Sequence, residues 1–125
     1  MSEPNTESNR FAGKVKQAED PNEKALRVKV NALKRTIKDL VYAKKEVERE
    51  TERLEQILKA DPDRAPQQEK VIDEARMMVP HSENRIMSSV KDLSDFIEKE
   101  GESISNEELM ELARATVLDG QSAIS

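Results

Sequence analysis

Apolar residues that recur at intervals of three and four constrain the fold of this chain more than any other feature. Such spacing is typical of a helix that packs lengthwise against another helix. Asp20 and Pro21 precede the first stripe and supply a helix cap and a first helical residue. A helix is therefore predicted over about residues 21–60. Its stripe consists of Val30, Leu33, Ile37, Leu40, Val47, Leu54 and Leu58.

A second stripe follows a short segment that contains Pro62 and Pro66. These prolines and the lack of periodicity mark the segment as a loop. The second stripe predicts a helix over about residues 65–100, with an apolar face wider than one partner helix requires. Met78 flanks this stripe, and we expect its side chain in the core. The stripe itself consists of Ile72, Ala75, Val79, Ser82, Ile86, Ser89, Leu93 and Phe96.

A third, shorter helix can supply the missing cover. Ser105 followed by Glu108 has the form of a capping box, in which the serine side chain caps the first turn. Gly120 is a typical residue just beyond the end of a helix. We therefore expect this helix over about residues 106–119.

These patterns together predict an all-α fold, an antiparallel three-helix bundle of two long heptad helices and a shorter third. The bundle should span residues 20–119, between a disordered N-terminal tail at 1–19 and a C-terminal tail at 120–125. Lys44 and Thr51 fill two weak positions of the first stripe. If opposed residues have numbers that sum to 126, as Leu33 and Leu93 do, every position of the first stripe from Val30 to Leu54 then meets a position of the second. The third helix is too short to cover the whole hairpin, so the end that carries Val47 and Val79 should stay bare.

Pro80 lies in the middle of the second stripe. A proline inside a helix lacks the backbone donor, and its ring meets the carbonyl group four residues earlier, at a cost of about 3 kcal/mol. We therefore expect the second long helix to be kinked near Pro80.

Charge is distributed unevenly along the chain. Residues 24–45 hold eight Lys or Arg and one acidic residue, whereas residues 92–111 hold eight acidic residues and one lysine. The basic segment can be matched by the acidic one within the hairpin, bind nucleic acid, or bind an acidic protein surface. Nucleic acid is disfavoured, because only Tyr42 interleaves the basic residues and the acidic segment lies beside them. The sequence leaves the other two explanations open.

Catalytic chemistry has little to build on in this chain. It has one histidine, no cysteine, no Gly-rich phosphate loop and no Gly-x-Ser-x-Gly or His-Glu-x-x-His motif. We expect a protein that is not an enzyme and has neither cofactor nor metal site. No apolar run is long enough for a membrane span, and the absence of disulfides suits the cytosol.

Short motifs in all three predicted helices resemble the tubulin-binding cofactor A family. The most specific is the run Arg-Met-Met-Val-Pro at residues 76–80, together with Arg85. In the first helix, Arg-Val-Lys-Val at 27–30, Leu-Lys-Arg at 33–35 and Tyr-x-Lys-Lys-Glu at 42–46 match as well. Leu-Ala-Arg-Ala at 112–115 resembles the last helix of the family. The likeness extends from about residue 26 to residue 119.

The resemblance implies a tubulin-folding chaperone that acts without ATP. Such a protein binds β-tubulin intermediates released from the cytosolic chaperonin and holds them for the next cofactor. It would be a cytoplasmic, cytoskeleton-associated monomer, with a homodimer as the alternative state. A self-associating coiled-coil scaffold is the alternative function. The exposed positions that we expect to contact the partner are Lys34, Arg35, Lys38, Tyr42, Lys45, Arg76, Met77 and Arg85.

Overall fold

The first helix begins where its capping signals predict. The structure is a computed structural model that describes residues 20–125. Helix α1 spans Pro21–Ala60, and the side chain of Asp20 accepts a hydrogen bond from the backbone N–H of Asn22 at 2.9 Å. Because Pro21 has no N–H to donate, the first helical position suits it. At 40 residues, α1 is about 60 Å long.

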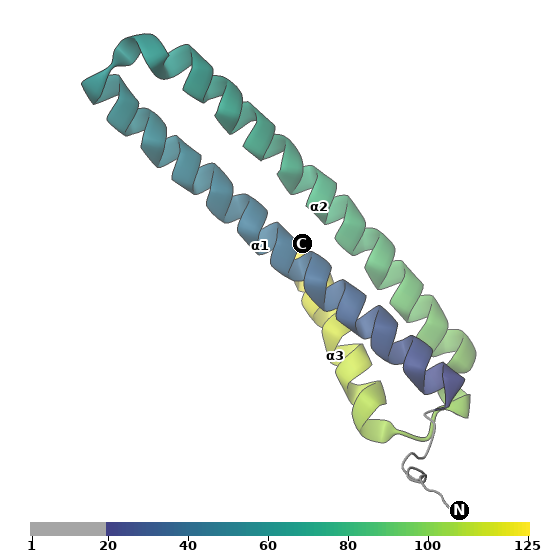
Figure 1. The fold of residues 1–125 in the computed structure, drawn as a ribbon. Coiled ribbons are helices and arrows are strands. Elements are labelled where there is room, and N and C mark those ends of the chain that lie inside the picture. Colours follow the sequence, from purple (N-terminus) through teal and green to yellow (C-terminus); the bar gives the residue numbers. More distant parts are fainter. Residues whose placement is uncertain (1–19) are drawn as a thin grey trace, which may run out of the picture.

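The second long helix runs back along the first. A short 3₁₀ turn at Pro62–Arg64 leads into α2, Ala65–Glu100, which lies antiparallel to α1 (Figure 1). Near the loop, the buried Gln68 side chain donates to the backbone carbonyl of Glu50 and to its carboxylate, each at 2.8 Å. The second of these bonds lowers the pKa of the Glu50 carboxyl group below its ordinary value. This contact joins the two helices at their otherwise polar end.

The third helix packs against one end of the hairpin. A second 3₁₀ turn, Gly101–Ser103, is followed by α3, Glu107–Ala123, which lies beside the first half of α1 and the last half of α2 (Figure 1). The core lies where the three helices meet, which confirms the predicted all-α fold with two long helices and one shorter helix. Its buried members are Leu26, Val30, Leu33, Leu40, Ile86, Leu93, Ile104, Leu109, Met110 and Ala113.

The third helix begins within one residue of its predicted start, but its capping residue and its C-terminal end differ from the prediction. The cap is Asn106, whose side chain accepts from the N–H of Leu109 at 3.1 Å, and not Ser105. The helix also continues through Gly120 instead of ending before it. Gly120 is buried, and a Cβ atom at this position would lie 2.7 Å from Cγ2 of Val90. The glycine therefore allows a close approach of α3 to α2 and does not cap the helix.

The predicted register between α1 and α2 is wrong by roughly one helical turn. It placed Lys29 level with Ile97, whereas Nζ of Lys29 lies 3.0 Å from Oδ2 of Asp92. Gln68 likewise donates to the backbone carbonyl of Glu50 at 2.8 Å, several residues short of Arg76, which the prediction placed opposite Glu50. Both contacts are displaced in the same direction, which indicates a shift along the helix axis.

Pro80 does not interrupt its helix. Helix α2 is continuous across this residue, and its ribbon shows no break (Figure 1). The side chain of Pro80 is exposed, so its ring lies on the outer surface of the hairpin. The backbone carbonyl of Arg76 lacks the N–H donor that an ordinary residue at position 80 would supply. The kink expected near Pro80 stays a prediction.

Two further predictions concern the N-terminal tail and the absence of a membrane-spanning helix. The tail predicted at residues 1–19 lies outside the described residues. Within residues 20–125, no helix combines the length and the apolar character that crossing a membrane requires.

Candidate functional site

Helix α3 leaves one whole face of the α1–α2 hairpin uncovered. In the view of Figure 1, α3 passes behind α1, so the face toward the reader is formed by the two long helices alone. The half near the loop is also bare on the side of α3, as expected from the short third helix. Val47 and Val79 are half-buried there, because the two long helices partly cover them. The candidate site is therefore the uncovered face.

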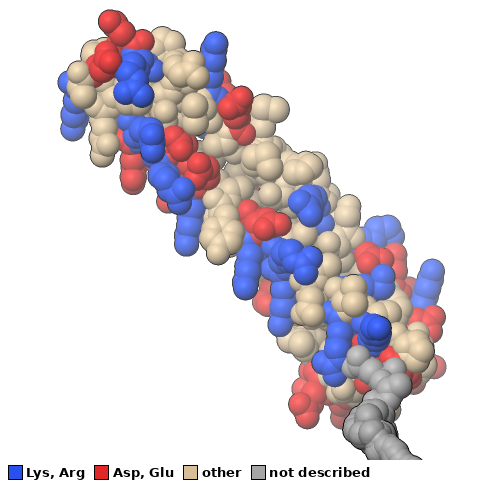
Figure 2. Space-filling view, in the orientation of Figure 1, with Lys and Arg blue, Asp and Glu red and all other residues tan. Residues whose placement is uncertain are grey.

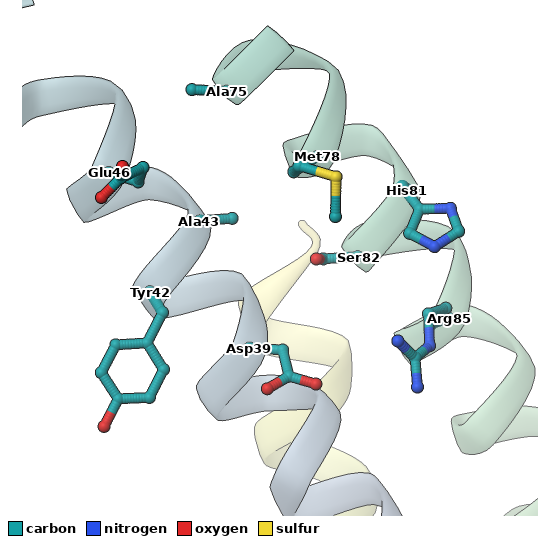
Figure 3. A pocket seen from close by; sticks show the side chains of 9 residues that line it. All are labelled: Asp39, Tyr42, Ala43, Glu46, Ala75, Met78, His81, Ser82 and Arg85. Carbon is teal, nitrogen blue, oxygen red and sulfur yellow. The ribbon is translucent and has the colours of Figure 1, made fainter. Parts of the chain in front are cut away.

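Midway along this face, α1 and α2 border a hollow of about 390 Å³, which we call the central hollow. Figure 3 shows the side chain of Met78 directed into the gap between the helices, with Asp39 and Arg85 on opposite sides of it. The aromatic ring of Tyr42 points outward from α1 (Figure 3). The lining residues are Asp39, Tyr42, Ala43 and Glu46 on α1 and Ala75, Met78, His81, Ser82 and Arg85 on α2.

Met78 contradicts our expectation of a core residue. Its side chain is 50% exposed. The reason is that α3 packs on the other face of the hairpin, so nothing covers the side of α2 on which Met78 lies (Figure 3). A flexible thioether at the mouth of an open hollow can adapt its shape to a partner's side chain.

A second hollow of about 390 Å³ adjoins the first and shares His81 and Arg85 with it. We call it the basic hollow, because Arg35 of α1 and Arg85 of α2 both border it and no acidic residue does. Its other lining side chains are His81 and small or uncharged polar residues. The complete lining is Ala32, Arg35, Thr36, His81, Asn84, Arg85, Ser88 and Ser89.

Most of the basic residues of α1 are not matched within the hairpin. Lys29 pairs with Asp92 at 3.0 Å, and its Nζ lies 5.4 Å from the centre of the Phe96 ring. In the described part of the chain, no ion pair holds any of the other basic site residues; these are Lys34, Arg35, Lys38, Lys45, Arg76 and Arg85. Figure 2 shows Lys and Arg distributed along the exposed face among acidic and uncharged residues. Intramolecular pairing thus leaves these charges available to a partner.

The structure brings some of the predicted contact residues together and separates others. Tyr42 and Arg85 line the central hollow, and Arg35 joins Arg85 in the basic hollow. Lys34, Lys38 and Lys45 are exposed on α1, which agrees with their selection as surface positions.

The two predicted residues that precede Pro80 lie outside both hollows. Met77 is 70% exposed on α2. Arg76 lines a separate hollow near the loop, together with Leu54 and Ile72. The predicted register placed Leu54 opposite Ile72. The run at residues 76–80 therefore does not present one compact surface.

Sequence reasoning missed the acidic side of the central hollow. Asp39 and Glu46 lie on α1 two turns apart, on the same side as Ala43. This spacing places them on one helix face, but only the position of α2 shows that this face borders a hollow. On α2, Ala75 and Ser82 belong to the predicted stripe and Met78 flanks it, and all three also border the central hollow.

The chemistry of this face is that of binding. Among residues 20–125, no group of three or more His, Cys, Asp or Glu side chains could hold a metal ion. Both hollows lie between α1 and α2, and their side chains offer charge, hydrogen-bond donors and a little apolar surface; Figure 3 shows those of the central hollow. An elongated helical bundle with such a face belongs to the class of small helical proteins that act by binding other molecules.

Comparison with known proteins identifies one family within this class. The family model described as Tubulin binding cofactor A matches residues 21–117, and the chain belongs to this family. Membership confirms the resemblance found in the sequence. It also confirms that the protein is not an enzyme, because the curated relatives are named as folding cofactors and chaperones.

Several relatives cover most of the chain. Tubulin-folding cofactor A of Arabidopsis thaliana is 36% identical over 103 residues, which is 75% of this chain and 86% of the relative. Tubulin-specific chaperone A of Homo sapiens is 28% identical over 94 residues, 74% of this chain and 87% of the relative.

Two solved structures share the fold. The crystal structure of recombinant tubulin-binding cofactor A from Leishmania major is 70% identical, with a TM-score of 0.81, and covers 86% of this chain and 100% of its own. The crystal structure of tubulin folding cofactor A from Arabidopsis thaliana is 33% identical, with a TM-score of 0.73, and covers 81% of this chain and 96% of its own.

Proposed function

We propose that this protein is a tubulin-folding chaperone. It binds β-tubulin intermediates after their release from the cytosolic chaperonin and holds them for the next folding cofactor, without ATP. Its family and the names of its curated relatives support the tubulin-specific role. A protein that only holds its client needs an extended complementary surface and no active site.

The uncovered face of the hairpin is the observation that carries this proposal. It offers unpaired cations on α1 and exposed apolar side chains at Tyr42 and Met78, which are 66% and 50% exposed. Exposed aromatic and apolar residues amid polar ones are typical of a surface that binds protein. The two long helices hold this face along their length, so little ordering entropy is lost when the client binds.

The proposed function places the protein in the cytoplasm, in association with the cytoskeleton. The proposed partner is β-tubulin, and neither nucleic acid nor a membrane is part of the function. We propose a monomer as the working state, since α3 already covers the apolar core. A homodimer that pairs two uncovered faces is the alternative.

Size-exclusion chromatography with light scattering tests the proposal. The purified protein is run alone and then mixed with β-tubulin freshly released from chaperonin. We expect a monomer that shifts into a complex with β-tubulin. A stable dimer that ignores β-tubulin would refute the chaperone proposal and favour the self-associating scaffold.

Paired variants then test the face. Replacing Tyr42 and Met78 together, as Tyr42→Ala and Met78→Ala, should abolish or strongly weaken the complex. Leu118→Ala removes a 63% exposed side chain from α3 and serves as the control, which should still bind. Equal loss in both variants would show that the uncovered face is not the binding surface.

A further inference from the structure

We propose that the basic hollow between Arg35 and Arg85 receives side-chain carboxylates from an acidic segment of a protein client. This inference rests on the proposed function and adds the chemistry of what is recognised. The occupant is a protein segment in which an acidic residue is followed, one or two helical turns later, by an apolar residue. The acidic residue enters the basic hollow, and the apolar residue lies over the central hollow.

The lining of the basic hollow favours an anion. Two guanidinium groups reach it from opposite helices, and Asn84, Ser88 and Ser89 add polar groups that can donate hydrogen bonds. No carboxylate lines this hollow. Two like charges that border one concavity raise each other's electrostatic energy, and an anion between them relieves it. Arginine also matches a carboxylate with two parallel hydrogen bonds.

Arg35 and Arg85 differ from two other arginines of α1, which are paired with carboxylates of their own helix. Arg49 lies 2.6 Å from the carboxylate of Glu46, and Arg53 lies 3.6 Å from that of Glu50, each one turn back on α1. Arg35 has Asp39 one turn ahead, at a spacing that commonly forms ion pairs on helices. No ion pair joins these two in the described structure, and Asp39 lines the central hollow instead.

The neighbouring hollow decides which kind of acidic molecule fits. Asp39 and Glu46 line it, and they would repel a continuous chain of phosphates such as a nucleic acid backbone. A protein segment can avoid this repulsion by placing an uncharged side chain there. Met78, Ala43 and Ala75 provide the apolar contact for it (Figure 3).

Matched charge variants of the full chain test the inference. The double variant Arg35→Gln/Arg85→Gln removes both guanidinium groups. The control Lys59→Gln/Lys70→Gln removes the same net charge from exposed positions near the loop, one on each long helix. A third variant, Asp39→Asn, removes the carboxylate that faces Arg85 across the central hollow (Figure 3). Circular dichroism verifies that each variant is folded.

Binding is measured by fluorescence anisotropy with a synthetic peptide of alternating Glu and Leu pairs, and with its analogue in which Gln replaces Glu. We expect the arginine variant to lose about tenfold or more in affinity for the acidic peptide. The lysine control should keep most of the affinity, and Asp39→Asn should bind the acidic peptide more tightly than the parent. The affinity of the parent should fall as salt is raised.

Three results would overturn the inference. They are equal losses in the arginine and lysine variants, equal affinity for the Glu and Gln peptides, and inorganic phosphate competing as strongly as the acidic peptide does. The last result would identify a general anion site.

Binding of β-tubulin separates this inference from the proposed function. If the parent binds β-tubulin and Arg35→Gln/Arg85→Gln binds it equally well, the basic hollow plays no part and the chaperone proposal survives. If the parent binds the acidic peptide but not β-tubulin, the hollow is supported and the chaperone proposal fails.

Discussion

Gly120→Ala should destabilise the protein, although helix propensity alone predicts the opposite. Gly120 lies inside α3, where alanine is favoured over glycine by about 1 kcal/mol. The new methyl group would lie 2.7 Å from Cγ2 of Val90 and 3.2 Å from Cδ1 of Leu33. Carbon atoms in good contact are about 3.5–4.0 Å apart, so the first of these distances is a severe overlap.

The neighbouring side chains have little room to relieve that overlap. Leu33 is fully buried at 0% exposure, and the branched Val90 strongly prefers one side-chain rotamer in a helix. Overpacking a core by a methyl group costs about 1–3 kcal/mol, which exceeds the gain in helix propensity. We expect a net loss of about 1 kcal/mol, equivalent to a fall in Tm of roughly 4–8 °C for a domain of this size.

Urea denaturation followed by far-UV circular dichroism measures this loss. Gln121→Ala, at the next and exposed position, is the control and should change the free energy of unfolding by less than about 0.5 kcal/mol. In a Val90→Ala background, where space is available, Gly120→Ala should become stabilising. If Gly120→Ala raised stability in the parent chain, the close packing of α3 against α2 would be refuted.

Three other predictions concern local features. Asn106→Ala should cost about 1 kcal/mol of stability through loss of the cap, whereas Ser105→Ala should cost much less; equal effects in urea denaturation would contradict the observed cap. NMR titration should find the pKa of Glu50 below the usual value for glutamate, and Gln68→Ala should raise it again. A folded-state pKa below the unfolded value stabilises the protein at pH values above the unfolded pKa, and this stabilisation is lost as the pH falls through the folded pKa. If the pKa of Glu50 were unchanged in Gln68→Ala, the hydrogen bond from Gln68 would not be the cause of the lowered pKa. Pro80→Ala restores a backbone donor and should raise stability by up to about 3 kcal/mol while weakening the β-tubulin complex; equal binding by both proteins would mean that the proline has no role in recognition.

Much of the helical organisation was readable from local sequence. The three-and-four spacing shows which face of each long helix turns toward its partner, because a helix has a fixed period. Leu58, at the loop end of the first stripe, is nevertheless 51% exposed. Asp20 with Pro21 marks the start of α1, since a cap acts through the backbone of its own first turn. At α3 the capping-box pattern indicated Ser105, whereas the next residue, Asn106, is the cap in the structure. Their intrinsic preferences are nearly equal, so packing of the helix decided between them.

The candidate site was predictable only in part. The exposure of Tyr42 and Met77 followed from their positions outside the apolar stripe. The role of Met78 did not, because its position beside the stripe suits a buried residue as well as an exposed one. Which of the two it becomes depends on the side of the hairpin against which α3 packs.

The sequence by itself determined that the chain forms two long amphipathic helices and a shorter one, that most charges lie outside the stripes, and that short motifs match one family. These properties depend on neighbours within a turn or two. Only the tertiary structure decided the axial register, the close approach at Gly120, and the pairing of Arg35 with Arg85 around one hollow. A repeating apolar stripe fits its partner nearly as well after a shift of one turn, so packing across all three helices selects the register and, with it, the surface that a partner meets.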